Sequence, residues 1–176
     1  MHPKDIFRID MALGYLAWAL LLTAYVWPRL KAMEGVAAQR AVATLHSFRF
    51  FGLVFLLPGF VGPNLPYAFA LPVAYGDLAT ALLAILALLT VRSRSLFWPL
   101  AWAFNLVGLT DLVMATANAV RFDVPSMAGQ LGAAYAIPIL YVPALFLTHL
   151  FALRLLLQTQ RRPIRKGWTE WKQRIA

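Results

Sequence analysis

Long apolar stretches alternate along this chain with short polar connections. There are five such stretches, at about residues 11–27, 43–60, 67–91, 96–120 and 131–157. A helix needs about 20 mainly apolar residues, within a range of roughly 17–25, to cross the hydrocarbon core of a bilayer. The pattern therefore predicts an all-α integral membrane protein, a single bundle of five transmembrane helices within residues 1–157.

Prolines mark where these helices should end or bend. Pro28 is predicted to close the first helix, and Pro58 to end or kink the second. Pro138 and Pro143 lie inside the fifth stretch and should bend it. The remaining residues, 158–176, form a basic tail.

Composition supports the membrane assignment. Of the 176 residues, 61% are hydrophobic and 13% charged, and the mean hydropathy is +0.69. A water-soluble domain of this size could not bury so much apolar surface. Cysteine is absent, which excludes disulfides, thiolate metal sites and a cysteine nucleophile.

Charge then orients the bundle. The net charge of +9 does not indicate nucleic-acid binding, because the cations are spread over the connections and the tail. One side of the predicted bundle carries Arg29, Lys31, Arg40, Arg92, Arg94, Arg154 and six tail cations; the other carries Lys4, Arg8 and Arg121. Cytoplasmic loops are enriched in Lys and Arg, so the N-terminus should lie outside and the C-terminus in the cytoplasm. The tail is either an ordinary cytoplasmic anchor or a segment lying on anionic headgroups.

Several polar residues lie inside the apolar stretches, where they are costly. They are His46, Arg49, Asp77, Asn105, Asp111 and His149. One charge at the centre of a span costs about 2.5–3.5 kcal/mol on insertion scales, so these groups should compensate one another. We expect Arg49 to bind Asp77 or Asp111, with the other acid bonded to Asn105 or protonated.

Two interpretations of this polar set stay open. Buried polar groups can simply tie helices together, which is the favoured interpretation for Asn105 alone. Arg49, Asp77 and Asp111 together favour a functional site, because ionisable groups are expensive to keep for packing. The nearby glycines at 52, 76 and 108 fit either a close approach of helices or room for a ligand.

The two histidines suggest a cofactor alternative. Helix-rise arithmetic places His46 and His149 at the same depth on different helices. They could be the axial ligands of a b-type haem, with Arg49 one turn away to meet a propionate. A metal site built from His149 and the two aspartates is not expected, because the same arithmetic separates them by more than roughly 10 Å in depth.

Catalytic signatures are missing. The sequence has no HExxH, no GxSxG and no glycine-rich phosphate loop. Asp77 and Asp111 could act as an acid and a base, but two buried carboxylates are a weak indication of catalysis. The sequence therefore leaves open whether the protein is an enzyme.

Four segments carry a resemblance to a known group of proteins. They are FRFFGLVFLL, LPYAFALPVAYGD, NLVGLTDLV and IPILYVPALFLTHL, between about Phe48 and Leu150. In them the chain resembles a family of uncharacterised bacterial polytopic inner-membrane proteins. The resemblance implies recurring polar positions at Arg49, Asp77, Asn105, Asp111 and His149, and it implies no activity. Relatives often carry another polar residue, such as glutamine, where this chain has His46. This counts against His46 as an indispensable haem ligand and suggests a more peripheral position for it.

These observations lead to one main hypothesis. We expect a bacterial inner-membrane protein that binds or transports a small polar or amphipathic ligand, a lipid among the candidates, through Arg49, Asp77, Asn105, Asp111 and His149. Whether proton movement is coupled to this stays open. The main alternative is a haem-binding electron-transfer or sensing protein that uses His46 and His149. A lipid-modifying enzyme and a structural subunit are further alternatives, and the protein could form oligomers.

Overall fold

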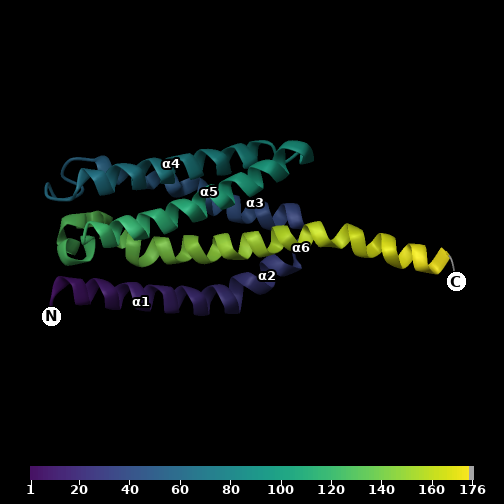
Figure 1. Ribbon diagram of the computed structural model, residues 1–176, viewed down its shortest axis with the longest axis horizontal. Helices are drawn as coiled ribbons and strands as arrows, with labels where there is room; N and C mark the ends of the chain where they lie inside the picture. The colour runs from purple at the N-terminus through teal and green to yellow at the C-terminus, as the bar shows by residue number, and fades with distance from the viewer. Residues whose placement is uncertain (175–176) are drawn as a thin grey trace.

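The helices of the computed structural model lie nearly parallel and form one elongated bundle (Figure 1). The structure describes the backbone of residues 1–174 and the side chains of residues 1–158. The elements, in order, are α1 (Pro3–Leu21), η1 (Leu22–Val26), α2 (Trp27–Ala32), α3 (Gly35–His46), η2 (Ser47–Leu56), α4 (Tyr67–Leu89), α5 (Arg94–Arg121), η3 (Val124–Tyr135), η4 (Ile137–Tyr141) and α6 (Val142–Arg174). The predicted basic tail, 158–176, falls almost wholly beyond the described side chains, although α6 continues through it to Arg174.

Within the described residues, four helical segments are long and apolar enough to cross a membrane. They are Pro3–Ala32, Tyr67–Leu89, Arg94–Arg121 and Ile137–Gln158. The second stretch of the sequence prediction, 43–60, is not one continuous α-helix. It is divided between the end of α3 and the 3-10 segment η2, and it ends at Leu56.

The sequence predicted that Pro28 ends the first helix, and this prediction was wrong. The helix begins already at Pro3 and passes through the π-helical turn η1 before it continues as α2 to Ala32. Proline lacks a backbone N–H, and a wider turn before it accommodates the missing helical hydrogen bond. The polar end of this segment therefore extends past the predicted boundary.

A second π turn explains how α1 packs on the bundle. Pro143 has no N–H to donate to the carbonyl of Ile139, which lies four residues earlier in η4. That carbonyl faces Gly14 of α1 so closely that a Cβ at position 14 would collide with it. Gly14 thus lets α1 approach the carbonyl that the proline leaves free.

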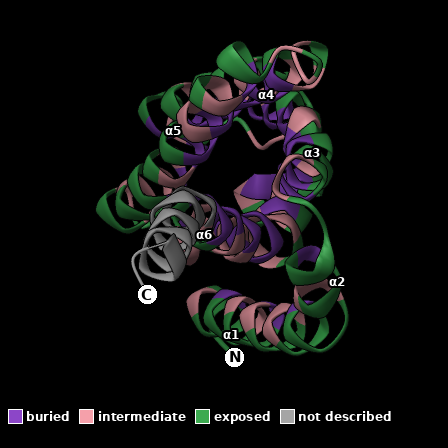
Figure 2. Cartoon of the chain, turned by 90° about the vertical axis from the view of Figure 1, so that its right-hand side faces the viewer, coloured by how far each residue is buried: buried purple, intermediate pink, exposed green. Residues whose placement is uncertain are grey.

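Buried residues gather on the inward sides of α3, α4, α5 and α6, and exposed residues lie on the outward sides (Figure 2). The apolar ones form two separate clusters. One, which we call the cavity end, includes Phe55, Phe69 and Leu131. The other, the alanine-rich end, includes Ala84, Ala101 and Phe104. The polar residues singled out in the sequence lie between them, because Asp77 follows Phe69 and precedes Ala84 along α4.

Candidate functional site

Arg49 is the centre of the polar cluster. Its side chain is fully buried, with 0% of its surface exposed. Nε donates a hydrogen bond to Asp77 Oδ1 at 2.7 Å, and Nη2 donates to Asp111 Oδ2 at 2.5 Å. Nη1 donates to the backbone oxygen of Gly108 at 3.1 Å and lies 3.2 Å from His149 Nε2. One guanidinium therefore joins η2, α4, α5 and α6.

Three glycines give this cluster its space. A Cβ at position 52 would collide with Asp77 Oδ2, and a Cβ at position 76 would collide with Asp111 Oδ1. A Cβ at position 108 would collide with His149 Nε2 and would lie 2.7 Å from Arg49 Nη1. Of the two interpretations of these glycines, the structure favours close approach, since the protein's own polar side chains occupy the space.

The guanidinium sets the direction of a hydrogen-bond chain behind it. Because arginine can only donate, His149 Nε2 must accept, which leaves its Nδ1 protonated in a neutral ring. Nδ1 then donates to Asn105 Oδ1 at 2.9 Å. The Asn105 amide donates to Gln39 Oε1 at 3.3 Å and to the Ala101 carbonyl at 2.8 Å. The chain ends where Gln39 Nε2 donates to the Ala152 carbonyl at 2.8 Å.

The sequence suggested a peripheral position for His46, but the residue lies in the interior, against this hydrogen-bond chain. Its ring is fully buried and stacks on the His149 ring with centroids 3.8 Å apart. Its Nε2 lies 3.1 Å from Thr148 Oγ1, while Nδ1 has no hydrogen-bond partner among the described residues. The haem alternative does not fit this geometry, because axial ligands must face each other across a porphyrin and these rings stack directly.

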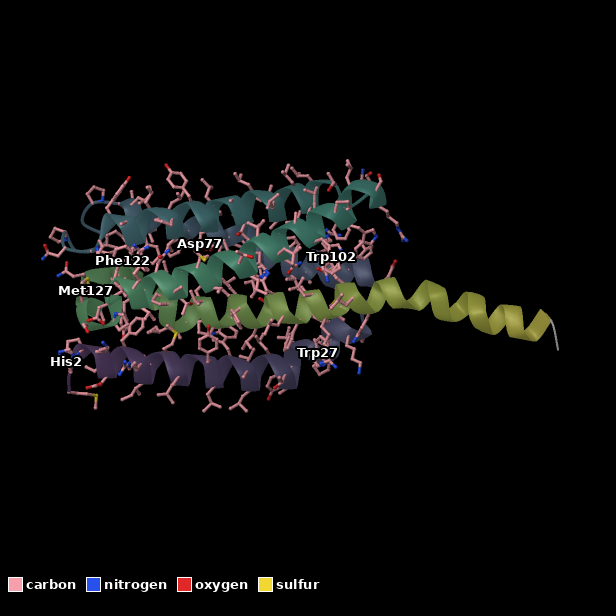
Figure 3. All side chains as sticks on the ribbon, viewed as in Figure 1. His2, Trp27, Asp77, Trp102, Phe122 and Met127 are labelled. Atoms are coloured by element: carbon pink, nitrogen blue, oxygen red, sulfur yellow. The ribbon has the colours of Figure 1, made fainter. Side chains whose placement is uncertain are left out.

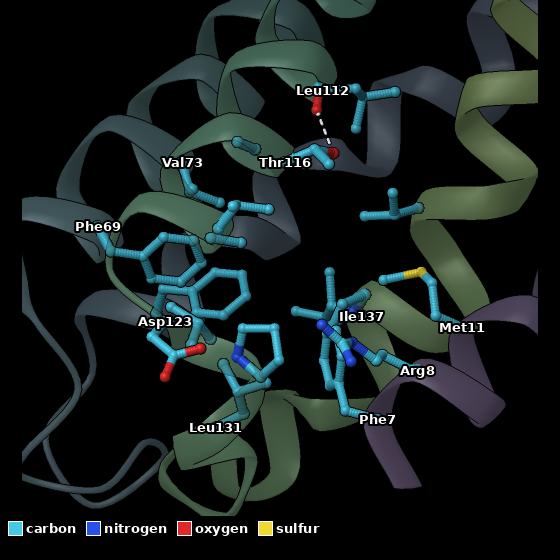
Figure 4. Close-up of a pocket in the computed structure, with 18 of the residues that line it drawn as sticks. Phe7, Arg8, Met11, Phe69, Val73, Leu112, Thr116, Asp123, Leu131 and Ile137 are labelled. Carbon is cyan, nitrogen blue, oxygen red and sulfur yellow. Dashed lines mark hydrogen bonds between the residues drawn. The ribbon is translucent and has the colours of Figure 1, made fainter. Parts of the chain in front are cut away.

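A cavity of about 360 Å³ reaches the two carboxylates from the other side. Asp77 and Asp111 form its inner end, and its walls are mostly apolar. Figure 4 shows Phe69 and Val73 on one side of the cavity and Phe7 and Met11 of α1 on the other. The wall continues along α5 through Leu112, Ala115, Thr116 and Ala119. The wall follows α5 from Asp111 to Val120, nine residues or roughly 14 Å by helix rise.

Charged residues also stand at the cavity mouth. Lys4 donates to Asp123 at 2.8 Å, and this hydrogen bond is the main reason that the pKa of Asp123 lies below its ordinary value. Arg8 of α1 makes no hydrogen bond or ion pair within the described part of the chain and reaches toward the cavity (Figure 4). The mouth therefore carries a paired and an unpaired cation.

Comparison with known proteins gives one match. The model of a domain of unknown function, DUF8737, matches residues 6–157. The chain belongs to this family. No curated protein and no solved structure matches it. The DUF8737 region thus contains every residue of the polar cluster and nearly the whole cavity wall, while the family's description assigns no activity.

The structure of this DUF8737 chain brings the predicted site residues together. Arg49, Asp77, Asn105, Asp111 and His149 form one connected network of hydrogen bonds. Asp77 of this network is labelled in Figure 3. Two details differ from the prediction. Arg49 binds both aspartates instead of one, and Asn105 binds His149 instead of an acid.

Sequence reasoning missed two members of the network. Gln39 lies in a segment that the sequence assigned to a polar connection, and yet it is 1% exposed and bonded to α5 and α6. Thr148 was overlooked beside His149, although its hydroxyl faces His46. A helix that starts at Gly35, as α3 does, would have placed Gln39 about two turns before His46 and three turns before Arg49, and so would have indicated Gln39. Among the described residues no cluster of three or more potential metal ligands is present.

Proposed function

We propose that this protein is a multi-pass membrane protein that binds or transports a small amphipathic ligand in the cavity ending at Asp77 and Asp111. The observation that carries the proposal is the cavity itself. Its apolar walls end at two carboxylates that share a fully buried guanidinium. Binding sites for small molecules have this character, a largely apolar hollow of a few hundred cubic ångströms with a few convergent polar groups.

The energetics of buried charge support a role beyond packing. Burying three ionisable side chains in an apolar bundle carries a large desolvation cost. Smaller polar groups could tie the helices together at a lower cost. A packing role would also leave the carboxylates enclosed. Here both carboxylates contribute to the wall of the cavity.

We further propose five crossings of a bacterial cytoplasmic membrane. The divided segment α3–η2 has twelve α-helical and ten 3-10 residues. With rises of about 1.5 and 2.0 Å per residue, it reaches roughly 38 Å, enough to cross a hydrocarbon core of about 30 Å. The distribution of Lys and Arg supports an orientation with the cavity mouth outside and Gln39 toward the cytoplasm.

Native mass spectrometry of the detergent-purified protein tests the proposal. Ala115 lines the cavity, whereas Val113 on the same helix is 53% exposed on the outer surface. Ala115→Trp should fill the cavity and remove a bound small molecule that the wild type retains. Val113→Trp adds the same bulk outside and should leave binding unchanged. Asp77→Asn should also weaken binding while the protein still elutes as the wild type does in size-exclusion chromatography.

Protein that purifies without a bound molecule is tested with added decanol, decanoate and decyltrimethylammonium. Binding of any of these to the wild type, and its loss in Ala115→Trp, supports the proposal. Equal binding in both proteins, or no binding of any of the three to the wild type, contradicts it.

A further inference from the structure

Charge balance at the inner end of the cavity is uneven. Asp77 and Asp111 bring two negative charges when both are ionised, and Arg49 brings one positive charge. The neighbouring His149 accepts from Arg49 and is therefore neutral. The cluster has a net charge of −1 unless something positive joins it, and an uncompensated charge is costly in an apolar surrounding.

Asp77 offers an acceptor to whatever joins. It is 7% exposed, and only its Oδ1 accepts a hydrogen bond among the described residues. The other oxygen, Oδ2, has no partner in that part of the chain, and the residue lines the cavity. Asp111 likewise uses Oδ2 for Arg49 and contributes to the same wall. A residue that lines an apolar cavity and keeps a carboxylate oxygen without a hydrogen-bond partner is suited to bind a donor group at the end of an apolar ligand.

We infer that the ligand of this cavity is an amphipathic monocation, such as a lipophilic amine, and that it exchanges with one proton at the Asp77–Asp111 pair. The inference rests on the proposed function and names its substrate class. An anionic head group is disfavoured at this end, because the cluster already carries the excess negative charge. The apolar part of the ligand would lie along Phe69, Leu112 and Ala115.

The exchange balances in charge. With no ligand, one aspartate holds a proton, and Arg49 compensates the other, so the cluster is neutral. When the cation binds, that proton leaves to water, and the cluster holds two carboxylates, one guanidinium and one ligand cation, again neutral. Proton and cation compete for the same charge, so each weakens the binding of the other by the same factor.

The groups that face the pair come from every element around it. Arg49 contributes from η2, and His149 from α6 with His46 stacked on it. Tyr141 of η4 lies close enough to Asp77 and Arg49 to interact electrostatically. Lys4, Arg8 and Asp123 line the far mouth, beyond Val120, which is itself roughly 14 Å from Asp111 by helix rise. Lys4 and Asp123 neutralise each other there, and the exposed Arg8 is screened by water over that distance.

The test compares three ten-carbon amphiphiles that differ in head charge. Binding of decyltrimethylammonium, decanol and decanoate to the detergent-solubilised protein is measured by displacement of radiolabelled decyltrimethylammonium. We expect the cation to bind at least about tenfold more tightly than the other two. Its affinity should rise by up to about tenfold per pH unit while the site still holds its proton, and an indicator dye should record about one proton released per cation bound.

Several results would overturn the inference. If decanol binds as tightly as the cation, the cavity is a binding site but does not select ligands by charge, which contradicts the inference. If decanoate binds best, the unpaired Arg8 at the mouth recognises the ligand instead. Cation binding without proton release, or without a pH dependence, contradicts the proposed exchange of cation and proton. Binding of none of the three contradicts the proposed function as well.

Two aspartate variants sharpen the test. Asp111→Asn leaves Arg49 paired with Asp77 in a cluster that is neutral without a proton. We expect it to lose about tenfold or more in cation affinity and to release no proton, while decanol binding stays unchanged. Asp5→Asn makes the same change at an exposed position outside the cavity lining and should keep both the affinity and the release. If Asp111→Asn does not fold, the comparison of head groups and the pH series on the wild type still test both the preference for a cation and the proton exchange.

Discussion

The two ends of the bundle are built from different side chains. At the alanine-rich end, six of the twelve buried cluster members are alanine, compared with three of twelve at the cavity end. Small side chains let helices approach closely and fill the space between them completely. Large side chains such as Phe55, Phe69 and Leu131 hold the helices of the other end apart and line a cavity. The charged cluster lies at the boundary, open to one end and closed to the other.

This difference indicates how a buried charge can be both fixed and accessible. Behind Arg49, the hydrogen bonds through His149, Asn105 and Gln39 end on backbone carbonyls, so the donors of that chain are satisfied within the protein. In front of it, the carboxylates meet the cavity. The closed end positions the guanidinium, and the open end leaves its partners available to a ligand.

The largest effect is expected where the two ends meet. Arg49→Ala removes the cation and leaves two carboxylates buried without compensation. Loss of one partner of a buried ion pair typically costs about 3–5 kcal/mol, so the free energy of unfolding in detergent should fall by that order. Arg8→Ala is the control, since Arg8 is exposed and unpaired among the described residues, and such surface changes stay within about 0.5 kcal/mol.

A second change tests whether the loss comes from uncompensated charge. Asp111→Asn in the Arg49→Ala background removes one of the two stranded carboxylates and should recover part of the stability. If the double variant is no more stable than Arg49→Ala, packing rather than charge causes the loss of stability at this position. Uncompensated charge at the boundary between the two ends would then not explain the effect.

A direct comparison of the two ends uses one substitution at two places on α5. Ala101 is fully buried at the alanine-rich end, and Ala115 is partly buried beside the cavity. Ala101→Leu should lower the free energy of unfolding by about 1–3 kcal/mol, because a filled core cannot take three more carbons without strain. Ala115→Leu should change it far less, since its side chain can extend into the cavity. Denaturant unfolding of both variants in the same detergent measures the difference, and equal losses would mean that the cavity end is packed as tightly as the other.

Much of the site could be predicted from the sequence because the cost of buried charge is so large. Arg49, Asp77 and Asp111 stand out in apolar stretches, and only mutual pairing makes them tolerable. The expected contact between the guanidinium and an aspartate is confirmed. The prediction that His149 lies far in depth from the acids was wrong, because helix-rise arithmetic ignores side-chain length. The guanidinium at the end of the long Arg49 side chain contacts His149 through Nη1 and Asp111 through Nη2.

The remaining errors have local physical causes. Hydropathy does not distinguish an α-helix from a 3-10 segment, so the change at Ser47 was not visible in the pattern. The prolines predict helix ends or bends, whereas π turns at Leu22–Val26 and Ile137–Tyr141 accommodate the hydrogen bonds that the prolines cannot make. The stacking of His46 on His149 depends on the placement of α3 against α6, which sequence spacing cannot provide.

The smallest expected effect lies at the outer rim of the cavity end, where Tyr135 of η3 donates to Asp10 of α1 at 2.7 Å. Burial, this hydrogen bond and the charge of Asp10 raise the pKa of Tyr135 from the ordinary 10.0 to about 12. The unfolded chain therefore loses the phenolic proton first as the pH rises, so the stability that the hydrogen bond contributes is complete below about pH 10 and is lost between pH 10 and 12.

Tyr135→Phe removes that contribution at every pH. The variant should be less stable than the wild type by about 1 kcal/mol at pH 8, and the difference should shrink toward zero by pH 12 in unfolding experiments at matched detergent. Tyr67→Phe is the control at pH 8, since Tyr67 is 67% exposed and its hydroxyl has no partner among the described residues. A difference that persists unchanged to pH 12 would show that the ring of Tyr135, packed on Phe7 at 5.9 Å, and not its hydrogen bond, fastens α1 over the cavity.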